Sequence, residues 1–238
     1  MITFKIHASS SKASLYTVDD GETKVLLECG LSVHKIRKAL NFGLSEISFA
    51  LLTHSHSDHS RAVHDLLKVG VDVYASQGTI DALGLTGHNI YPVKAGQGFI
   101  AKTWAIMPLE AQHDAPEPLS YLMTNSEGER FLFATDTYYL KNRFRRLDVI
   151  AVECNYALDI LNENVKAGSV APEVRKRVLR SHFSLHNVKE FLKANDLSRV
   201  EEIYLLHLSD DNSHAERFKR EVQELTGITT YIAEGDLV

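Results

Sequence analysis

The sequence predicts a layered α/β fold in which helices cover two facing sheets. Two observations carry this prediction. Short apolar runs of strand length alternate with amphipathic helical stretches, and strand-rich, mixed segments recur in two similar halves of the chain. With 44% hydrophobic and 24% charged residues among 238, the composition is that of an ordinary globular chain with enough apolar material for a core. We therefore expect a single domain over residues 1–238.

The first half is expected to open with three short strands before helices and strands alternate. Residues 3–7, 15–18 and 23–27 have the character of strands, separated by Ser-rich and Asp-Gly turns. Ser32 caps a helix with one apolar face. Residues 47–53 form an almost unbroken apolar run, which indicates a strand covered on both faces.

The rest of the chain continues the alternation. Strands are expected at residues 71–74, 90–93, 102–107, 119–124, 130–134, 148–152, 203–206 and 228–232. Helices are expected at residues 172–180 and 185–194. A capping box of Ser213 and Glu216 predicts the start of a last helix that runs through Leu225.

Neither a membrane segment nor a disulfide framework is expected. No apolar run approaches the roughly 18 residues that cross a bilayer, and residues 1–7 read as a strand rather than a signal peptide. Cys29 and Cys154 are the only cysteines and each ends an apolar run, so we expect two buried reduced thiols. These features favour a cytoplasmic protein without a membrane partner. The net charge of -5 argues against a surface that binds nucleic acid all over, but it leaves room for a local basic patch.

One short segment concentrates metal-binding side chains. Residues 53–59 read Thr-His-Ser-His-Ser-Asp-His, which gives the pattern H-x-H-x-D-H. The pattern places His54, His56, Asp58 and His59 where a buried strand ends and a helix begins. Three imidazoles and a carboxylate within six positions suit a metal site better than core packing, because a rigid strand end lets such side chains converge. The alternative is a polar helix cap whose histidines have no role in metal binding.

Three more candidate ligands follow other strands. His113, Asp136 and His207 each come after an apolar run. Taken singly, a histidine in such a place is more often a capping or surface residue, and an aspartate more often forms a turn. Their shared strand-end position, added to the first cluster, makes all three expected ligands, and Asp136 could bridge two ions.

The order of these motifs resembles the metallo-β-lactamase superfamily over nearly the whole chain. The resemblance implies an αββα sandwich, in which helices lie outside two facing mixed sheets. It also implies two metal ions, the first held by His54, His56 and His113, the second by Asp58, His59 and His207, with Asp136 between them. Asp58, combined with the pair His113 and Asp114, resembles the phosphodiesterase and nuclease branches rather than the antibiotic-degrading ones.

Shorter segments are similar to the YycJ/WalJ-type group of small bacterial and phage proteins, which resemble 5′-to-3′ DNA exonucleases. These segments are residues 152–155, 172–184 and 207–209. The chain departs from the group at Glu28, where the family usually has Asp before Cys-Gly, and at Leu185, where the group usually has Asn after His-x-Ser.

The donor set indicates the metal and the reaction. Imidazoles with carboxylates suit Zn²⁺, with Mn²⁺ or Fe²⁺ as further choices, and argue against Ca²⁺ or Mg²⁺. Two such ions lower the pKa of a bridging water, so hydroxide is present near neutral pH and can attack a phosphodiester. We expect Asp58 and His182 to be catalytic residues. Residues 180–184 resemble the His-x-Ser/Thr motif of related nucleases, in which the histidine faces the phosphate; the alternative is a helix N-terminus capped by Ser184.

The preferred function is a DNA nuclease that resembles a 5′-to-3′ exonuclease, with nucleic acid or a nucleotide as substrate. Basic runs at residues 141–146 and 175–180 could line the DNA backbone, although charge runs are usually solvated faces. Tyr138, Tyr139 and Tyr156 could stack on bases, although tyrosines more often pack at a core edge.

Other classes stay open at this point. A cyclic-nucleotide phosphodiesterase is the runner-up, and an RNase of the same fold is less favoured. A glyoxalase-type thioester or lactone hydrolase and a metal-stabilised binding module are further alternatives. Since dimers are common in the family, the resemblance also allows a homodimer.

Overall fold

The computed structural model describes residues 1–233, which form two compact units. The first unit comprises Met1–Glu110 and Ala115–Glu129, and the second comprises Ala111–Asp114 and Arg130–Ala233. The short segment around His113 therefore belongs to the second unit, although the chain on either side of it belongs to the first.

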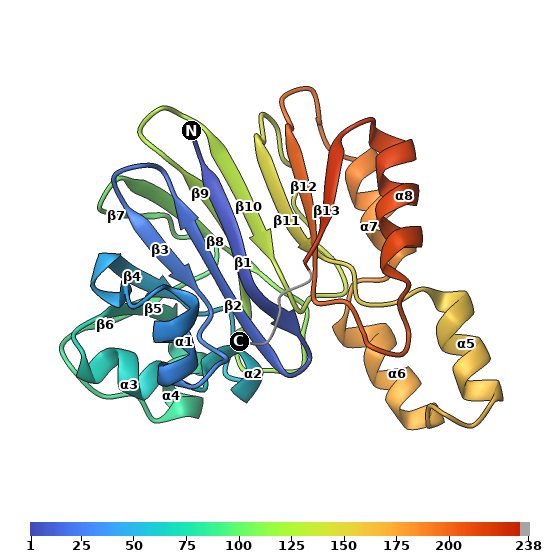
Figure 1. Ribbon diagram of the computed structural model, residues 1–238, viewed down its shortest axis with the longest axis horizontal. Coiled ribbons are helices and arrows are strands. Elements are labelled where there is room, and N and C mark those ends of the chain that lie inside the picture. Colours follow the sequence, from blue (N-terminus) through green and yellow to red (C-terminus); the bar gives the residue numbers. More distant parts are fainter. Residues whose placement is uncertain (234–238) are drawn as a thin grey trace. The chain divides into compact units, whose positions relative to one another are not determined.

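A six-stranded sheet organises the first unit, in the order β1-β2-β3-β4-β5-β6 (Figure 1). Its strands are β1 (Thr3–Ser10), β2 (Ala13–Asp19), β3 (Lys24–Leu27), β4 (Ile47–Leu51), β5 (Asp72–Ser76) and β6 (Ile90–Val93). The first three strands pair antiparallel, and β3 to β6 pair parallel. Parallel pairing brings the carboxyl ends of β3 and β4 to the same edge of the sheet.

Short helices connect the parallel strands of the first unit. They are α1 (Val33–Ala39), α2 (Ser57–Ser60), α3 (Val63–Lys68) and α4 (Gln77–Leu83), with a 3₁₀ turn at Leu44–Glu46. Ile36 of α1 and Leu66 of α3 are buried in one core with Ala50 and Leu52, so the apolar face of each helix covers the sheet. Three antiparallel strands complete the unit: β7 (Phe99–Ala101), β8 (Trp104–Glu110) and β9 (Leu119–Thr124).

Four parallel strands form the centre of the second unit, in the order β13-β12-β11-β10. They are β10 (Arg130–Ala134), β11 (Val149–Glu153), β12 (Glu202–Leu206) and β13 (Thr229–Ile232). The helices are α5 (Leu158–Lys166), α6 (Pro172–Ser181), α7 (Leu185–Lys193) and α8 (Ala215–Thr226).

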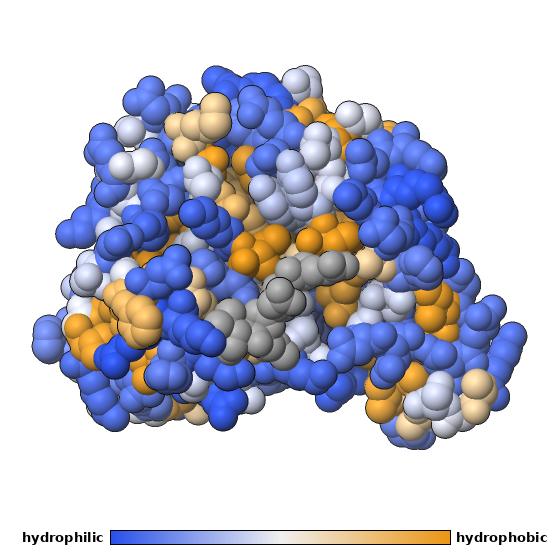
Figure 2. Space-filling model, in the orientation of Figure 1, coloured by the Kyte–Doolittle hydropathy of each residue, from blue (hydrophilic) through white to orange (hydrophobic). Residues whose placement is uncertain are grey.

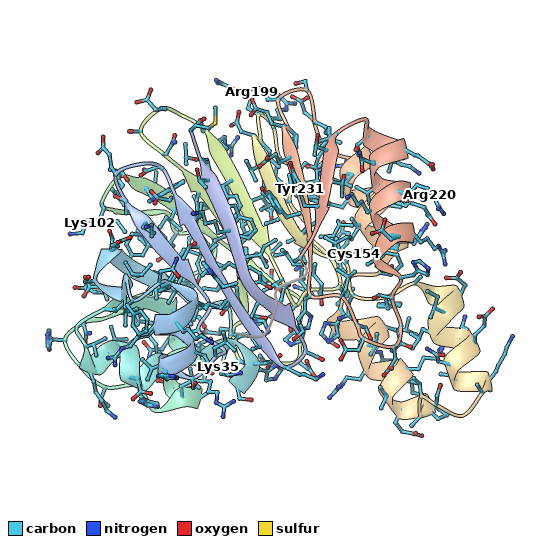
Figure 3. The ribbon with its side chains drawn as sticks, in the orientation of Figure 1. Lys35, Lys102, Cys154, Arg199, Arg220 and Tyr231 are labelled. Carbon is cyan, nitrogen blue, oxygen red and sulfur yellow. The ribbon has the colours of Figure 1, made fainter. Side chains whose placement is uncertain are left out.

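Helix α8 shows how this unit separates its core from solvent. It lies beside β13 and α7, and it buries Phe218 and Val222 (Figure 1). Its outer surface is hydrophilic (Figure 2), and Arg220 points away from the sheet (Figure 3). The helix is therefore amphipathic, as its sequence period requires.

The predicted strands are all present. One of them starts at a different residue, and two helices were not expected. The strand expected at 102–107 begins at Trp104 instead, because residues 102–103 form a tight turn between β7 and β8 in which Lys102 has a left-handed φ of 55°. Helices α4 and α5 were not predicted from the sequence. Helix α5 fully buries little more than Leu161, so its apolar stripe is too thin to be recognised.

The predicted capping box of α8 is wrong. His214 occupies the N-cap and accepts a hydrogen bond from the backbone N–H of Arg217. The hydroxyl of Ser213 instead donates to the backbone carbonyl of Ser209 at 2.6 Å, so it is committed to the preceding turn.

Both cysteines are free and buried, as expected, and Cys154 lies inside the second unit at the end of β11 (Figure 3). Burial raises the pKa of each thiol. Among the helices of residues 1–233, none combines the length and the apolar character that crossing a bilayer demands.

Gly30 allows the loop after β3 to lie directly against helix α2. A Cβ atom built at Gly30 would stand only 1.6 Å from the carbonyl oxygen of Asp58 and 2.3 Å from its carbonyl carbon. The same loop is tied to the helix by a hydrogen bond from the N–H of Cys29 to the carbonyl of His59. Glycine is therefore required here by backbone-to-backbone contact.

We predict that Gly30→Ala lowers the free energy of unfolding by about 2 kcal/mol or more, since the added methyl forces two backbone segments apart. Gly98→Ala is the matched control, because its Cβ would meet only the mobile end of Met107 at 3.1 Å. Urea unfolding of both variants measures the effect. Equal stability of the two variants would contradict the close approach at Gly30.

Candidate metal centre

The first cluster of histidines lies where β4 ends and α2 begins. His56 takes the N-cap position of α2 with an extended backbone. The hydroxyl of Ser60 donates to the carbonyl oxygens of Ser55 and His56, which closes a tight turn around the motif. His54 and His59 are completely buried. Ser60, which follows the last histidine of the motif, thus helps to fold the segment that carries all three.

The side chains of this cluster crowd together. Nε2 of His54 lies 3.0 Å from Nδ1 of His56, and Nε2 of His59 lies 3.5 Å from Oδ2 of Asp58. The ring centroids of His54 and His59 are 4.2 Å apart. The hydroxyl of Thr53 is 2.9 Å from Nδ1 of His54, a contact that orients the ring and leaves its Nε2 for coordination.

A buried glutamate stands behind this cluster. Glu28 follows β3 directly and is completely buried. Its Oε1 lies 3.5 Å from Nδ1 of His59 and accepts the backbone N–H of Thr53 at 3.3 Å. Burial raises the pKa of Glu28, and the attraction of His59 offsets only part of that rise. A carboxyl group in this position fixes the orientation of an imidazole whose Nε2 is to bind metal.

In the second unit, three neighbouring strands deliver polar side chains to one place. Asp136 comes two residues after β10, Glu153 is the last residue of β11, and His207 follows β12. Because these strands pair in parallel, the three side chains share one edge of the sheet. Together with His182 they place ligand atoms that all lie within 4.8 Å of one another.

Asp136 directs its two carboxylate oxygens at two different histidines. Oδ2 lies 3.5 Å from Nε2 of His113, and Oδ1 lies 3.4 Å from Nδ1 of His207. Nδ1 of His113 donates to the backbone carbonyl of Ser181 at 2.8 Å, which holds the ring in place. Burial lowers the pKa of His113 despite the attraction of Asp136, which favours the neutral imidazole that binds a metal.

Glu153 links His182 with His207. Its Oε1 accepts from Nδ1 of His182 at 2.6 Å and from Nδ1 of His207 at 3.1 Å. Its Oε2 accepts the backbone N–H groups of Thr137 and Phe183 at 3.0 and 3.1 Å. Burial alone would raise the pKa of this completely buried carboxyl, but the charge of His182 and these bonds hold it below its ordinary value.

His182 is held between helices α6 and α7, and its Nδ1 is committed to Glu153. Burial alone would lower the pKa of its imidazole, but the charge and the hydrogen bond of Glu153 outweigh it and raise the pKa to about 9. Ser184 caps α7 by accepting from the N–H of Asn187 at 3.1 Å, so the helix-capping alternative also describes this segment.

The residues present fit metal ions. With Zn–N and Zn–O bonds of about 2.0–2.1 Å, two ligands of one tetrahedral ion lie about 3.3 Å apart. The pairs His54–His56, Asp58–His59 and His113–Asp136 have ligand atoms 3.0, 3.5 and 3.5 Å apart. Imidazole nitrogens with few carboxylates are the donors that Zn²⁺ and Mn²⁺ accept.

The structure thus brings the expected residues together in two sets, one within each unit. His54, His56, Asp58 and His59 form the first set, and His113, Asp136, His182 and His207 form the second. Glu28 and Glu153 were not predicted from the sequence as site residues. The pattern that predicted the ligands applies to these two glutamates as well, since each stands at the end of a buried apolar strand.

Comparison with known proteins identifies the family of the chain. Residues 23–208 match the β-lactamase superfamily domain. Exodeoxyribonuclease WalJ of Streptococcus pneumoniae is 29% identical over 98% of this chain and 89% of its own length. Exodeoxyribonuclease YycJ of Bacillus anthracis is 28% identical over 93% of this chain and 88% of its own length.

Solved structures show the same fold at low sequence identity. The metallo-β-lactamase fold protein YhfI of Bacillus subtilis superposes with a TM-score of 0.75 at 16% identity, over 97% of this chain and 95% of that one. The short form of human tRNase Z gives a TM-score of 0.62 at 13% identity, over 88% and 93%. The resemblance seen in the sequence is confirmed: this chain belongs to the β-lactamase superfamily, has the metallo-β-lactamase fold and is a metal-dependent hydrolase.

Proposed function

We propose that this hydrolase is a DNA nuclease, similar to 5′-to-3′ exonucleases, that uses two divalent ions, Zn²⁺ or Mn²⁺. The first ion would take His54, His56 and His113, the second Asp58, His59 and His207, and Asp136 would bridge them. One observation carries the proposal. In each unit, imidazoles and carboxylates at strand ends approach within the spacing of co-ligands, and a completely buried glutamate supports them.

The chemistry divides between the ions and the protein. When bound, two divalent cations lower the pKa of water and neutralise the oxygens of a phosphodiester. The protein positions the ligands, and His182 supplies a proton to the oxygen that leaves. Glu153 holds Nδ1 of His182, so the opposite ring nitrogen, Nε2, is the atom that can face the substrate. None of the described residues forms a hydrogen bond with that Nε2.

DNA is the proposed substrate for two reasons. Two curated relatives are named exodeoxyribonucleases, and they align over nearly the whole chain. Helix α6, which ends at His182, also exposes Lys176, Arg177 and Arg180 to solvent. Cations on the helix that leads to the proposed proton donor suit contact with a phosphate backbone.

The first prediction from the proposed function concerns Asp136. Asp136→Asn keeps the shape of the side chain and tolerates the left-handed backbone of that position (φ 47°), but it removes the charge that would bridge two ions. We expect at least a hundredfold lower turnover of bis(p-nitrophenyl) phosphate with Mn²⁺ or Zn²⁺, and an unchanged melting temperature of the metal-free protein. Asp65→Asn, at an exposed position, is the control.

The same assay tests the substrate. Wild-type protein is given 5′-phosphorylated duplex DNA, single-stranded DNA, RNA and a cyclic nucleotide in parallel, with EDTA as the metal-free reference. Preferential cleavage of DNA supports the proposal. Preferential cleavage of the cyclic nucleotide or of RNA would contradict DNA as the substrate. A wild type that is inactive with every divalent ion would instead favour a binding module.

The second prediction separates proton donation by His182 from metal binding. His182→Ala should lower turnover of DNA at least tenfold, since a poor leaving oxygen needs a proton. Hydrolysis of bis(p-nitrophenyl) phosphate should fall much less, because p-nitrophenolate leaves without one. The control is His186→Ala, an exposed neighbour. Equal losses on both substrates would rule out the acid role.

The third prediction concerns Glu28. Glu28→Gln retains the size of the side chain but weakens its hold on Nδ1 of His59, so metal affinity should fall about 10–100-fold. Competition with a chromophoric chelator measures this affinity without reference to activity. Glu46→Gln, whose carboxylate pairs with Lys24 at 2.6 Å on the surface, should bind metal as the wild type does. If Glu28→Gln binds metal with wild-type affinity, Glu28 does not support the metal site.

A further inference from the structure

A cleft in the second unit is not used by the chemistry described above. It has a volume of about 330 Å³ and lies between residues 138–143 and helix α7. Its apolar floor includes Leu140, Phe183 and Phe191, which are almost completely buried. Tyr138 and Tyr139 line it and remain 37% and 51% exposed, so their rings are accessible rather than part of a core.

The near end of this cleft is joined to the proposed catalytic residues. Tyr138 comes two residues after Asp136, and Phe183 follows His182 directly. The backbone N–H of Tyr138 donates to the carbonyl of Gln112 at 3.2 Å, and Gln112 precedes His113. The backbone that lines the near end of the cleft is therefore continuous with the segments that carry Asp136 and His182.

The far end of the cleft is fixed by hydrogen bonds. The guanidinium of Arg143 donates to the carbonyl of Ala194 at 2.5 Å, and the N–H of Phe144 donates to Oδ1 of Asn195 at 2.6 Å. At the near end, the side-chain amide of Asn187 donates to the carbonyl of Tyr138 at 3.3 Å. The segment is thus held by α7 at one end and by the two residues that follow α7 at the other, which makes the cleft preformed although its wall lacks regular secondary structure.

The chemistry of the lining matches one nucleotide. The cleft volume is at the lower end of the range for small-molecule sites, where an apolar floor is combined with a few polar groups. Exposed tyrosine rings bind nucleobases by stacking, whatever the base. The ammonium group of Lys141, also in the lining, supplies positive charge for a phosphate.

We propose that this cleft holds the nucleotide adjacent to the scissile phosphate of a DNA strand, with its base stacked against Tyr139. The inference rests on the proposed nuclease function and adds to it a subsite for the substrate. It makes hydrolysis depend on a base next to the phosphate that is cleaved, without regard to which base it is.

Two small substrates test the subsite. Thymidine 5′-(p-nitrophenyl phosphate) and its 3′ isomer carry one nucleoside, whereas bis(p-nitrophenyl) phosphate carries none. The wild type should hydrolyse at least one thymidine ester with a kcat/KM at least fivefold above that of bis(p-nitrophenyl) phosphate. Tyr139→Ala should reduce this preference ratio at least fivefold, and Tyr139→Phe, which retains the ring, should keep it.

Tyr231→Ala is the matched control, because Tyr231 lies on β13 with 39% exposure and does not line the cleft (Figure 3). It should leave the preference ratio unchanged. A wild type that hydrolyses all three esters equally overturns the subsite but leaves the nuclease proposal standing. Loss of the preference in Tyr139→Phe also overturns it, since stacking needs only the ring. A wild type that cleaves DNA but none of the esters overturns the subsite alone, and one that cleaves neither DNA nor the esters overturns the nuclease proposal and the subsite together.

Discussion

Parallel pairing of neighbouring strands is the constraint on which both ligand clusters depend. A parallel strand must end at the same edge as its neighbour, so a polar residue placed after each buried run is carried to a shared position. In the second unit this holds for Asp136, Glu153 and His207, which come from strands far apart in the sequence. In the first unit, parallel β3 and β4 bring Glu28 to the turn that carries His54. The residues of each cluster are thus brought together at the edge of a parallel sheet.

The same constraint explains how much could be predicted from the sequence. His54 to His59 form a continuous motif, and His113, Asp136 and His207 each follow an apolar run, so local pattern identified them. Glu28 and Glu153 also end such runs, but their role depends on which imidazole lies opposite, and that is decided by tertiary contacts. Helix α5 and the cleft beside α7 were not predicted. Their contacts come from separate segments of the chain, which leave no periodic apolar pattern in the sequence.

Each of the two glutamates has two structural roles in its cluster. Each is completely buried, and each contacts both an imidazole and a backbone N–H of the loop that follows the neighbouring strand. One carboxyl group therefore orients a ring and at the same time anchors the segment beside it. This coupling makes the position of the ligands depend on the core of each unit rather than on flexible loops.

Glu28, Asp136 and His207 share an unfavourable backbone, with φ values of 63°, 47° and 52°. For residues other than glycine this conformation costs about 1–2 kcal/mol each, and less for an aspartate such as Asp136. A glycine would relieve the strain at any of these positions but could neither bind nor orient a metal. The metal-free chain is therefore less stable than its fold permits, and an ion that binds only the folded state would restore stability in proportion to its concentration and affinity. Metal supply would then govern the lifetime of the protein as well as its activity.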